Sequence, residues 1–130
     1  MGAIVAALSY SAISISRWIR TVRKVFASFF TADGVFHAVY GEYKGRQAIA
    51  EFIREHIRQG NEDNARHLLS NFTVLEAENA PVIGGYVTKI RLQPAPITII
   101  AYAGLQATVT REGANWRIKR LELSITLAPA

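Results

Sequence analysis

His67 and Asn71 are the pair of residues in this chain best placed for acid–base chemistry. They lie four residues apart in a segment with β periodicity, so they are expected to share one strand face, with Leu69 between them. A neutral imidazole can take up or release a proton near neutral pH, or hold a ligand carbonyl, while an asparagine orients it. The alternative is a hydrogen-bonded structural histidine that needs no substrate.

His37 is the second candidate, since it alternates with Val35 and Val39 and would join His67 if that strand face meets a cavity. Two histidines without a carboxylate make a weak metal site, because a facial triad needs a third ligand. The nearest acids are Glu42, expected in a turn, and Glu51, expected on a solvated helix face. We therefore expect no metal and no cofactor.

Several aromatic side chains offer an apolar body with a polar tip, which suits either a pocket for a ring-shaped ligand or a sheet interface. Sequence does not separate these two uses. The candidates for ligand contact are Tyr40, Tyr86, Tyr102 and Trp18. Arg120 and Glu122 share a strand face and are expected to pair; Glu122 would be a candidate acid or base only on a concave face.

Composition indicates one globular domain over residues 1–130, half of it apolar. The net charge is +5, but the first 32 residues hold no acid and four bases: Arg17, Arg20, Arg23 and Lys24. Without these four, eleven basic residues remain against ten acidic ones, so the excess is one helix face, which argues against a nucleic-acid partner. The uncharged first 16 residues lack a positive leader and are too short to span a membrane. Together with the absence of cysteine, this favours a cytoplasmic location.

The periodicity indicates helices first and strands after them. An apolar stripe at intervals of three and four predicts a helix that ends near Thr31, and a second stripe predicts a helix over Arg46–Arg58. Strands are expected at residues 35–39, 43–44, 66–76, 82–92, 97–110 and 115–127, the last four as an antiparallel meander. This is an α+β fold: a strongly curved, mainly antiparallel sheet with helices over its concave face. The strand Ile97–Tyr102 is apolar on both faces, which predicts a homodimer through the sheet.

The order of several short segments resembles the SnoaL-like branch of the nuclear-transport-factor-2-like superfamily. The segments are "FTADGVF", "GRQAIAEFI", "ARHLLSNFTV", "GGYVT" and "AGLQATVTREGANWRIKRLEL". The resemblance spans almost the whole chain. It implies a conical α+β barrel with a deep pocket, commonly dimeric, in a superfamily that includes polyketide cyclases, ketosteroid isomerases and scytalone dehydratase as well as proteins that only bind.

The resemblance also implies a function for the pocket. The match at His67 and Asn71 points to binding of an apolar aromatic or polycyclic metabolite, with His67 as the acid or base of an isomerase, cyclase or dehydratase if the protein is an enzyme. Two acids usual in relatives are replaced by Ile15 and Ala107. The alternative is therefore a non-catalytic module that binds a ligand or another protein. A histidine within reach of a carboxylate would favour catalysis, and a pocket without titratable groups would favour binding.

Overall fold

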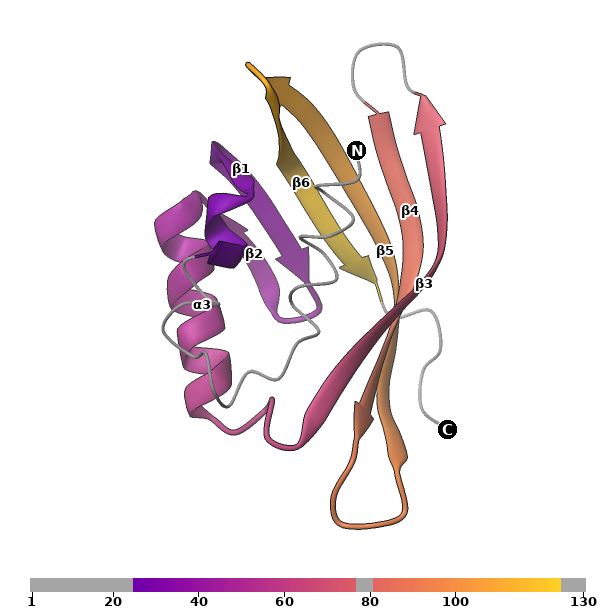
Figure 1. The fold of residues 1–130 in the computed structure, drawn as a ribbon. Coiled ribbons are helices and arrows are strands. Elements are labelled where there is room, and N and C mark those ends of the chain that lie inside the picture. The colour runs from indigo at the N-terminus through magenta and orange to yellow at the C-terminus, as the bar shows by residue number, and fades with distance from the viewer. Residues whose placement is uncertain (1–24, 77–80, 125–130) are drawn as a thin grey trace.

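The computed structural model describes residues 25–76 and 81–124 (Figure 1). Residues 25–28 are helical, and one longer helix and six strands follow. In chain order these are β1 (Phe30–Ala38), β2 (Gly41–Lys44), α3 (Arg46–Arg58), β3 (Ala65–Glu76), β4 (Pro81–Arg91), β5 (Thr98–Glu112) and β6 (Asn115–Ser124). No helix in these ranges is long and apolar enough to cross a membrane.

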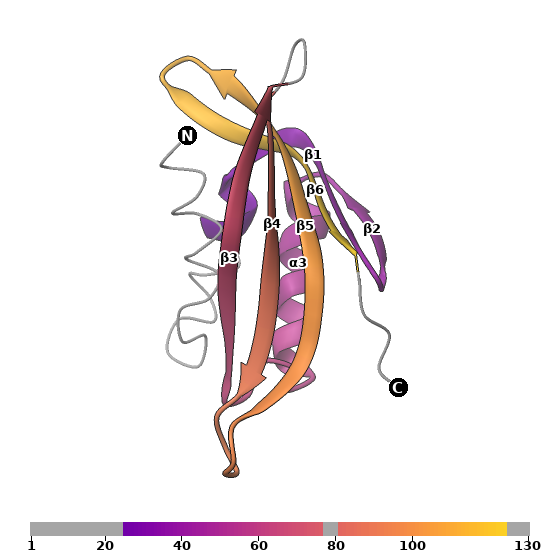
Figure 2. The ribbon, with the colours of Figure 1, turned by 90° about the vertical axis from the view of Figure 1, so that its right-hand side faces the viewer.

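The six strands form a single sheet in the order β2-β1-β6-β5-β4-β3. Neighbours are antiparallel except β1 and β6, which run parallel. The sheet bends around α3, which lies on its concave side and contacts β1 and β2 (Figures 1 and 2). The predicted α+β fold with a curved, mainly antiparallel sheet is confirmed, and the sheet is an open cone whose end strands β2 and β3 do not pair.

Helix α3 has the predicted bounds, because its sequence carries one clear apolar stripe. Ile49 and Ile57 are buried on that stripe, with Phe52 and Ile53 packed against the core. Arg46 Nε donates to the carbonyl oxygen of Phe30 at 2.9 Å, which ties the start of the helix to β1. At the other end, Gly60 has a φ of 78°, a conformation that glycine adopts without strain. The helix thus ends in a tight turn that leads into β3.

The first strand begins earlier than the sequence suggests, at Phe30 instead of residue 35. Its pairing with β6 shifts register between Phe30 and Val35, so a bulge lets one strand include the turn-like letters Ala-Asp-Gly. Gly34 makes this bulge feasible: a Cβ there would lie 2.8 Å from the Cβ of Phe30 and 3.1 Å from the carbonyl oxygen of Ile118. These turn-forming residues do bend the chain, but the bend is a bulge within β1 and does not end the strand.

The core lies between α3 and the concave face of the sheet. Its largest fully buried side chains are Phe30, Ile49, Ile83, Val109 and Ile118. Burial of each such side chain stabilises the fold by about 1.5–3 kcal/mol. These residues come from β1, α3, β4, β5 and β6, so the core fixes the distance between the helix and the sheet around the site described below.

Candidate functional site

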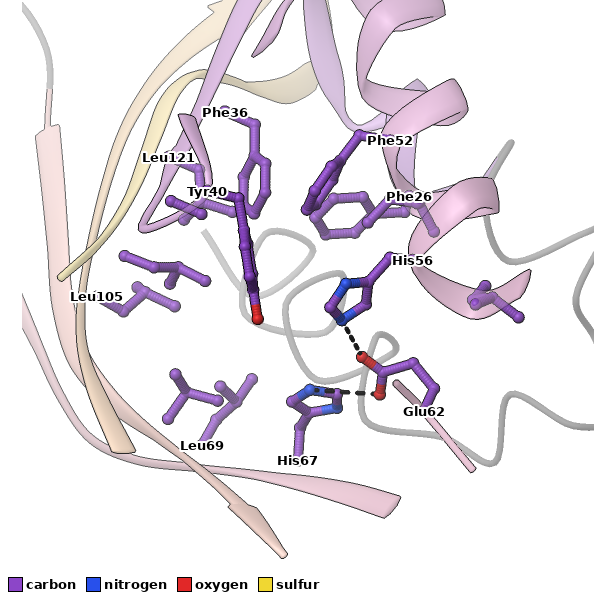
Figure 3. A pocket seen from close by; sticks show the side chains of 15 residues that line it. Phe26, Phe36, Tyr40, Phe52, His56, Glu62, His67, Leu69, Leu105 and Leu121 are labelled. Carbon is purple, nitrogen blue, oxygen red and sulfur yellow. Dashed lines mark ion pairs between the residues drawn. The ribbon is translucent and has the colours of Figure 1, made fainter. Parts of the chain in front are cut away.

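A cavity of about 160 Å³ lies between α3 and the concave face of the sheet (Figure 3). Its wall is mostly apolar, and four of its residues carry polar atoms on their side chains: Tyr40, His56, Glu62 and His67. The apolar part comprises Phe26, Phe36, Ala38, Phe52, Ile53, Ile57, Leu69, Val87, Leu105, Leu121 and Leu123. An apolar hollow with a few convergent polar groups is the usual form of a small-molecule site.

Aromatic rings make up one side of the cavity and centre on Phe52 of α3. The Phe52 ring stacks on Tyr43 with centroids 4.2 Å apart and lies 5.6 Å from Phe36 and 6.0 Å from Tyr40. Tyr40 is 66% exposed and stands at the edge of the cavity, with its hydroxyl end directed toward the side occupied by His67 and Leu69 (Figure 3). These contacts hold the rings in place along one wall of the cavity.

The polar groups of the cavity converge on the carboxylate of Glu62, which lies in the turn between α3 and β3. Its Oε1 is 2.9 Å from His56 Nε2 and 3.0 Å from Lys89 Nζ, and its Oε2 is 3.6 Å from His67 Nε2. The Glu62 side chain is only 8% exposed. Lys89 also donates to the carbonyl oxygen of Asn61 at 2.5 Å, so the turn is fixed to β4. Side chains from α3, β3 and β4 therefore position one buried carboxylate.

Hydrogen bonding assigns His56 a supporting role. Its Nδ1 lies 3.2 Å from the side-chain amide nitrogen Nδ2 of Asn61, which can only donate a hydrogen bond, so Nδ1 is the acceptor. The ring proton then sits on Nε2 and is donated to Glu62 Oε1. Both nitrogens of His56 are thus engaged, and the ring holds Glu62 in position.

Glu62 and His67 are set to different charge states by their surroundings. Burial raises the pKa of Glu62, but the hydrogen bond from His56 and the charges of His67 and Lys89 outweigh it, so the pKa lies below its ordinary value. Burial lowers the pKa of His67, and the attraction of Glu62 only partly offsets this effect. Near neutral pH, Glu62 is an anion and His67 is a neutral imidazole that can accept a proton.

The structure brings His67 and Tyr40 to this cavity but places His37 on the other side of the sheet. Phe36 and Ala38 line the cavity, so the side chain between them points outward and is 47% exposed. The turn of this hairpin falls two residues earlier than expected, at residues 39–40 instead of 41–42, and Glu42 belongs to β2 opposite His37. His37 Nδ1 lies 3.9 Å from Glu42 Oε1.

Asn71 is not beside His67, because a bulge interrupts β3. Ser70 pairs with Tyr86 and Thr73 pairs with Gly84, so the two residues between them face a single residue of β4. Asn71 takes a φ of 56°, a left-handed conformation that asparagine tolerates. The bulge ends the alternation that starts at His67, and Asn71 lines a second, more open depression of about 510 Å³.

The remaining predicted ligand contacts lie away from the cavity or outside the described residues. Tyr86 and Tyr102 stack with centroids 5.7 Å apart. Tyr102 lies beside Thr88 of β4, and Thr88 lies beside Leu68 of β3. Because Leu68 is next to His67 in β3, Tyr102 is on the face opposite His67. Tyr86 lines the open depression. Trp18 lies outside the described residues.

Arg120 and Glu122 pair as expected, with Arg120 Nε 2.6 Å from Glu122 Oε1. Arg120 also contacts Glu42 at 3.0 Å, so this is an ion-pair network on the exposed outer face. Within the described ranges no three histidine or carboxylate side chains are arranged to hold a metal ion.

Sequence reasoning missed three residues of this cluster: His56, Glu62 and Lys89. His56 was visible in principle, because it continues the apolar stripe of α3 four residues after Phe52, where a polar side chain is unexpected. Glu62 gave no such signal: it sits in the polar segment Gly-Asn-Glu-Asp-Asn, and only the folded turn directs it inward.

Comparison with known proteins agrees with the fold. The family model for the SnoaL-like domain matches residues 22–122. No curated protein sequence shows significant similarity to this chain.

Solved structures with the same fold are numerous, and their sequences are distant. A variant of Rv3472, a function-unknown protein of Mycobacterium tuberculosis, superposes with a TM-score of 0.77 at 20% identity, covering 94% of this chain and 69% of that one. ActVI-ORFA of Streptomyces coelicolor gives 0.75 at 13% identity, covering 95% and 97%. Aln2 of a Streptomyces species gives 0.73 at 20% identity, covering 95% and 91%. At these identities the likeness concerns the fold.

Proposed function

The chain belongs to the SnoaL-like domain family, and on that premise we propose that it binds an apolar, ring-shaped metabolite in the cavity and transfers a proton through His67. The observation that carries this proposal is the position of His67. It is a neutral imidazole at an apolar cavity, with its Nε2 3.6 Å from the ionised Glu62.

The proposed step is general base catalysis. The unprotonated nitrogen of His67 removes a proton from a carbon next to a ligand carbonyl, and the resulting imidazolium returns the proton at another position or to a leaving hydroxyl. Glu62 favours this step because its negative charge stabilises the imidazolium while it exists. Isomerisation, cyclisation and dehydration all include such a transfer, so the geometry supports this class of reaction and no cofactor is needed for it.

Exchange of carbon-bound protons tests this proposal without knowledge of the natural substrate. Cyclohexanone in D₂O is incubated with the protein, and loss of the α-proton signal is followed by NMR. We expect exchange faster than with free imidazole at the same concentration, and a loss of about tenfold or more in His67→Gln, since a general base contributes about 10²–10⁴. His37→Gln makes the same chemical change on the outer face and should keep the wild-type rate. A wild-type rate equal to free imidazole, or full activity in His67→Gln, would refute the proposal.

The second candidate is ligand binding without catalysis. It is supported by Ala107, one of the positions where relatives usually carry an acid, which is fully buried in the core. It is also supported by Glu62, the one carboxylate of the cavity among the described residues, whose Oε1 is occupied by His56 and Lys89. Stabilisation by apolar ligands in a thermal-shift assay, without any proton exchange, would favour this function.

A homodimer through the outer face of the sheet is also proposed. Its support is the exposure of large apolar side chains on that face: Leu68 (52%), Tyr86 (38%) and Ile99 (70%). Sedimentation of the wild type as a dimer, and of Tyr86→Glu as a monomer, is the expected result. A monomeric wild type at tens of micromolar protein would contradict it. A cytoplasmic location stays a prediction.

A further inference from the structure

One oxygen of the cavity carboxylate has no hydrogen-bond partner. Glu62 Oε1 accepts hydrogen bonds from His56 and Lys89, whereas Oε2 is buried and has no hydrogen-bond partner among the described residues. An ionised carboxylate can only accept hydrogen bonds, and a buried oxygen without a donor is unfavourable. The pairing of Oε1 does not remove this cost, so Oε2 is suited to receive a donor from outside the protein.

A ligand group that donates to this oxygen would also lie close to His67 Nε2, which is 3.6 Å from Glu62 Oε2. That distance is too long for a direct hydrogen bond, whereas an oxygen atom about 2.8 Å from both atoms would bridge them. Both side chains line the cavity, so a ligand inside it lies beside this pair of atoms (Figure 3).

We infer that Glu62 Oε2 and His67 Nε2 form a subsite for one hydroxyl group on a single-ring, phenol-like ligand, an inference that rests on the proposed ligand-binding function of the cavity. The ligand hydroxyl donates its proton to Glu62 Oε2, and its oxygen accepts a hydrogen bond from the Nε2–H tautomer of His67. The ring then lies among Phe36, Phe52 and Leu121.

The size of the cavity limits the buried part of the ligand to about one ring. A cavity of about 150 Å³ lined by Leu, Ile and Phe accommodates benzene, and the volume here is about 160 Å³. Any further ring extends past Tyr40 at the exposed edge.

The charge of the cluster selects a neutral hydroxyl over an acid. A ligand carboxylate has no proton to donate to Glu62 Oε2 and is repelled by its charge. The nearby cation, Lys89, already binds Glu62 Oε1 and the carbonyl oxygen of Asn61, and its side chain is 13% exposed. The charge of the subsite therefore favours a neutral hydroxyl group over a carboxylate.

Four para-substituted toluenes test this inference: toluene itself, p-cresol, 4-methylanisole and p-toluate, titrated against the full chain by NMR. They fill the cavity in the same way but differ in the group presented to Glu62. We expect p-cresol to bind about tenfold more tightly than toluene, the usual effect of a hydrogen bond to a charged group. 4-Methylanisole, which cannot donate, should bind no better than toluene, and p-toluate should bind more weakly.

Variants identify the group responsible. Glu62→Gln should bring the affinity for p-cresol within about threefold of that for toluene. Glu51→Gln, the same change on the exposed face of α3, should leave the preference intact. Equal binding of p-cresol and toluene by the wild type overturns the subsite while the cavity function stands. Absence of binding by all four probes overturns the cavity function and the subsite with it. The wild-type series separates these outcomes even if Glu62→Gln does not fold.

Discussion

Replacing Lys89 with methionine should destabilise the protein strongly, because it leaves the Glu62 carboxylate buried without its cation. The two groups are 3.0 Å apart, and their side chains are 13% and 8% exposed. At an effective dielectric constant of about 20, charges at this distance attract by about 5.5 kcal/mol before the cost of desolvation is counted. Removing one partner of a buried pair typically costs about 3–5 kcal/mol. Methionine keeps the aliphatic length of lysine, so little apolar packing is lost.

The measurement is urea unfolding of four proteins: wild type, Lys89→Met, Glu62→Gln and the double variant. We expect losses in the free energy of unfolding of about 3 kcal/mol for Lys89→Met and about 2 kcal/mol for Glu62→Gln. The double variant should lose less than the sum by about 2 kcal/mol, because neither charge is then left alone. Arg58→Met, which breaks an exposed pair with Glu55, is the matched control and should have little effect.

A loss below about 1 kcal/mol for Lys89→Met would refute this reasoning, since it would mean that Glu62 is solvated or protonated in the native state. Strict additivity in the double variant would also refute it, because the two side chains would then not interact in the way the 3.0 Å contact indicates.

Three further predictions concern pH and backbone geometry. The pKa values of His67 and Glu62 in the folded protein both lie below their ordinary values of 6.5 and 4.5, so the free energy of unfolding should be highest above about pH 6.5. As the pH falls it should decrease first because the unfolded chain protonates His67, and again below about pH 4.5 because the unfolded chain protonates Glu62. Urea midpoints measured against pH test this, and in His67→Gln they should change little between about pH 6.5 and 5. Gly34→Ala should cost about 2 kcal/mol by overpacking, measured by urea unfolding, and an unchanged midpoint would contradict the bulge contact of 2.8 Å. Asn71→Gly should be tolerated, whereas Asn71→Ala should lose about 1 kcal/mol by the same measurement; equal stabilities would argue against the left-handed conformation.

The fold was largely predictable because its signals are periodic and local. The stripe of α3 gave the bounds of the helix, and turn residues separated the four long strands. The resemblance placed His67 in a pocket, and the structure brings it to one. Alternation along a short strand does not tell which of its two faces is turned to the cavity. In the structure Phe36 faces the cavity, so His37 faces outward.

The cluster around Glu62 could not be assembled from the sequence. Asn71 was assigned to the face of His67 from the two-residue alternation of side chains along a strand. A bulge interrupts this alternation, and no distinctive residue pattern marks the bulge in the sequence. The inward direction of Glu62 depends on a turn whose geometry is set by Gly60 and by a lysine from β4, distant in sequence. Such long-range positioning is a property of the folded chain and has no local code.

The bulge in β3 also affects how the molecule resists self-association along its backbone. Among the described strands β3 lies at one end of the sheet, and the outer edge of a long end strand is where another extended chain can attach through the backbone. Asn71 and the residue after it break the regular spacing of the backbone groups along that edge and twist the strand at its centre. An incoming strand can keep register with only half of β3 at a time. The irregularity that removes Asn71 from the cavity therefore also makes this border of the sheet a poor template for fibril growth.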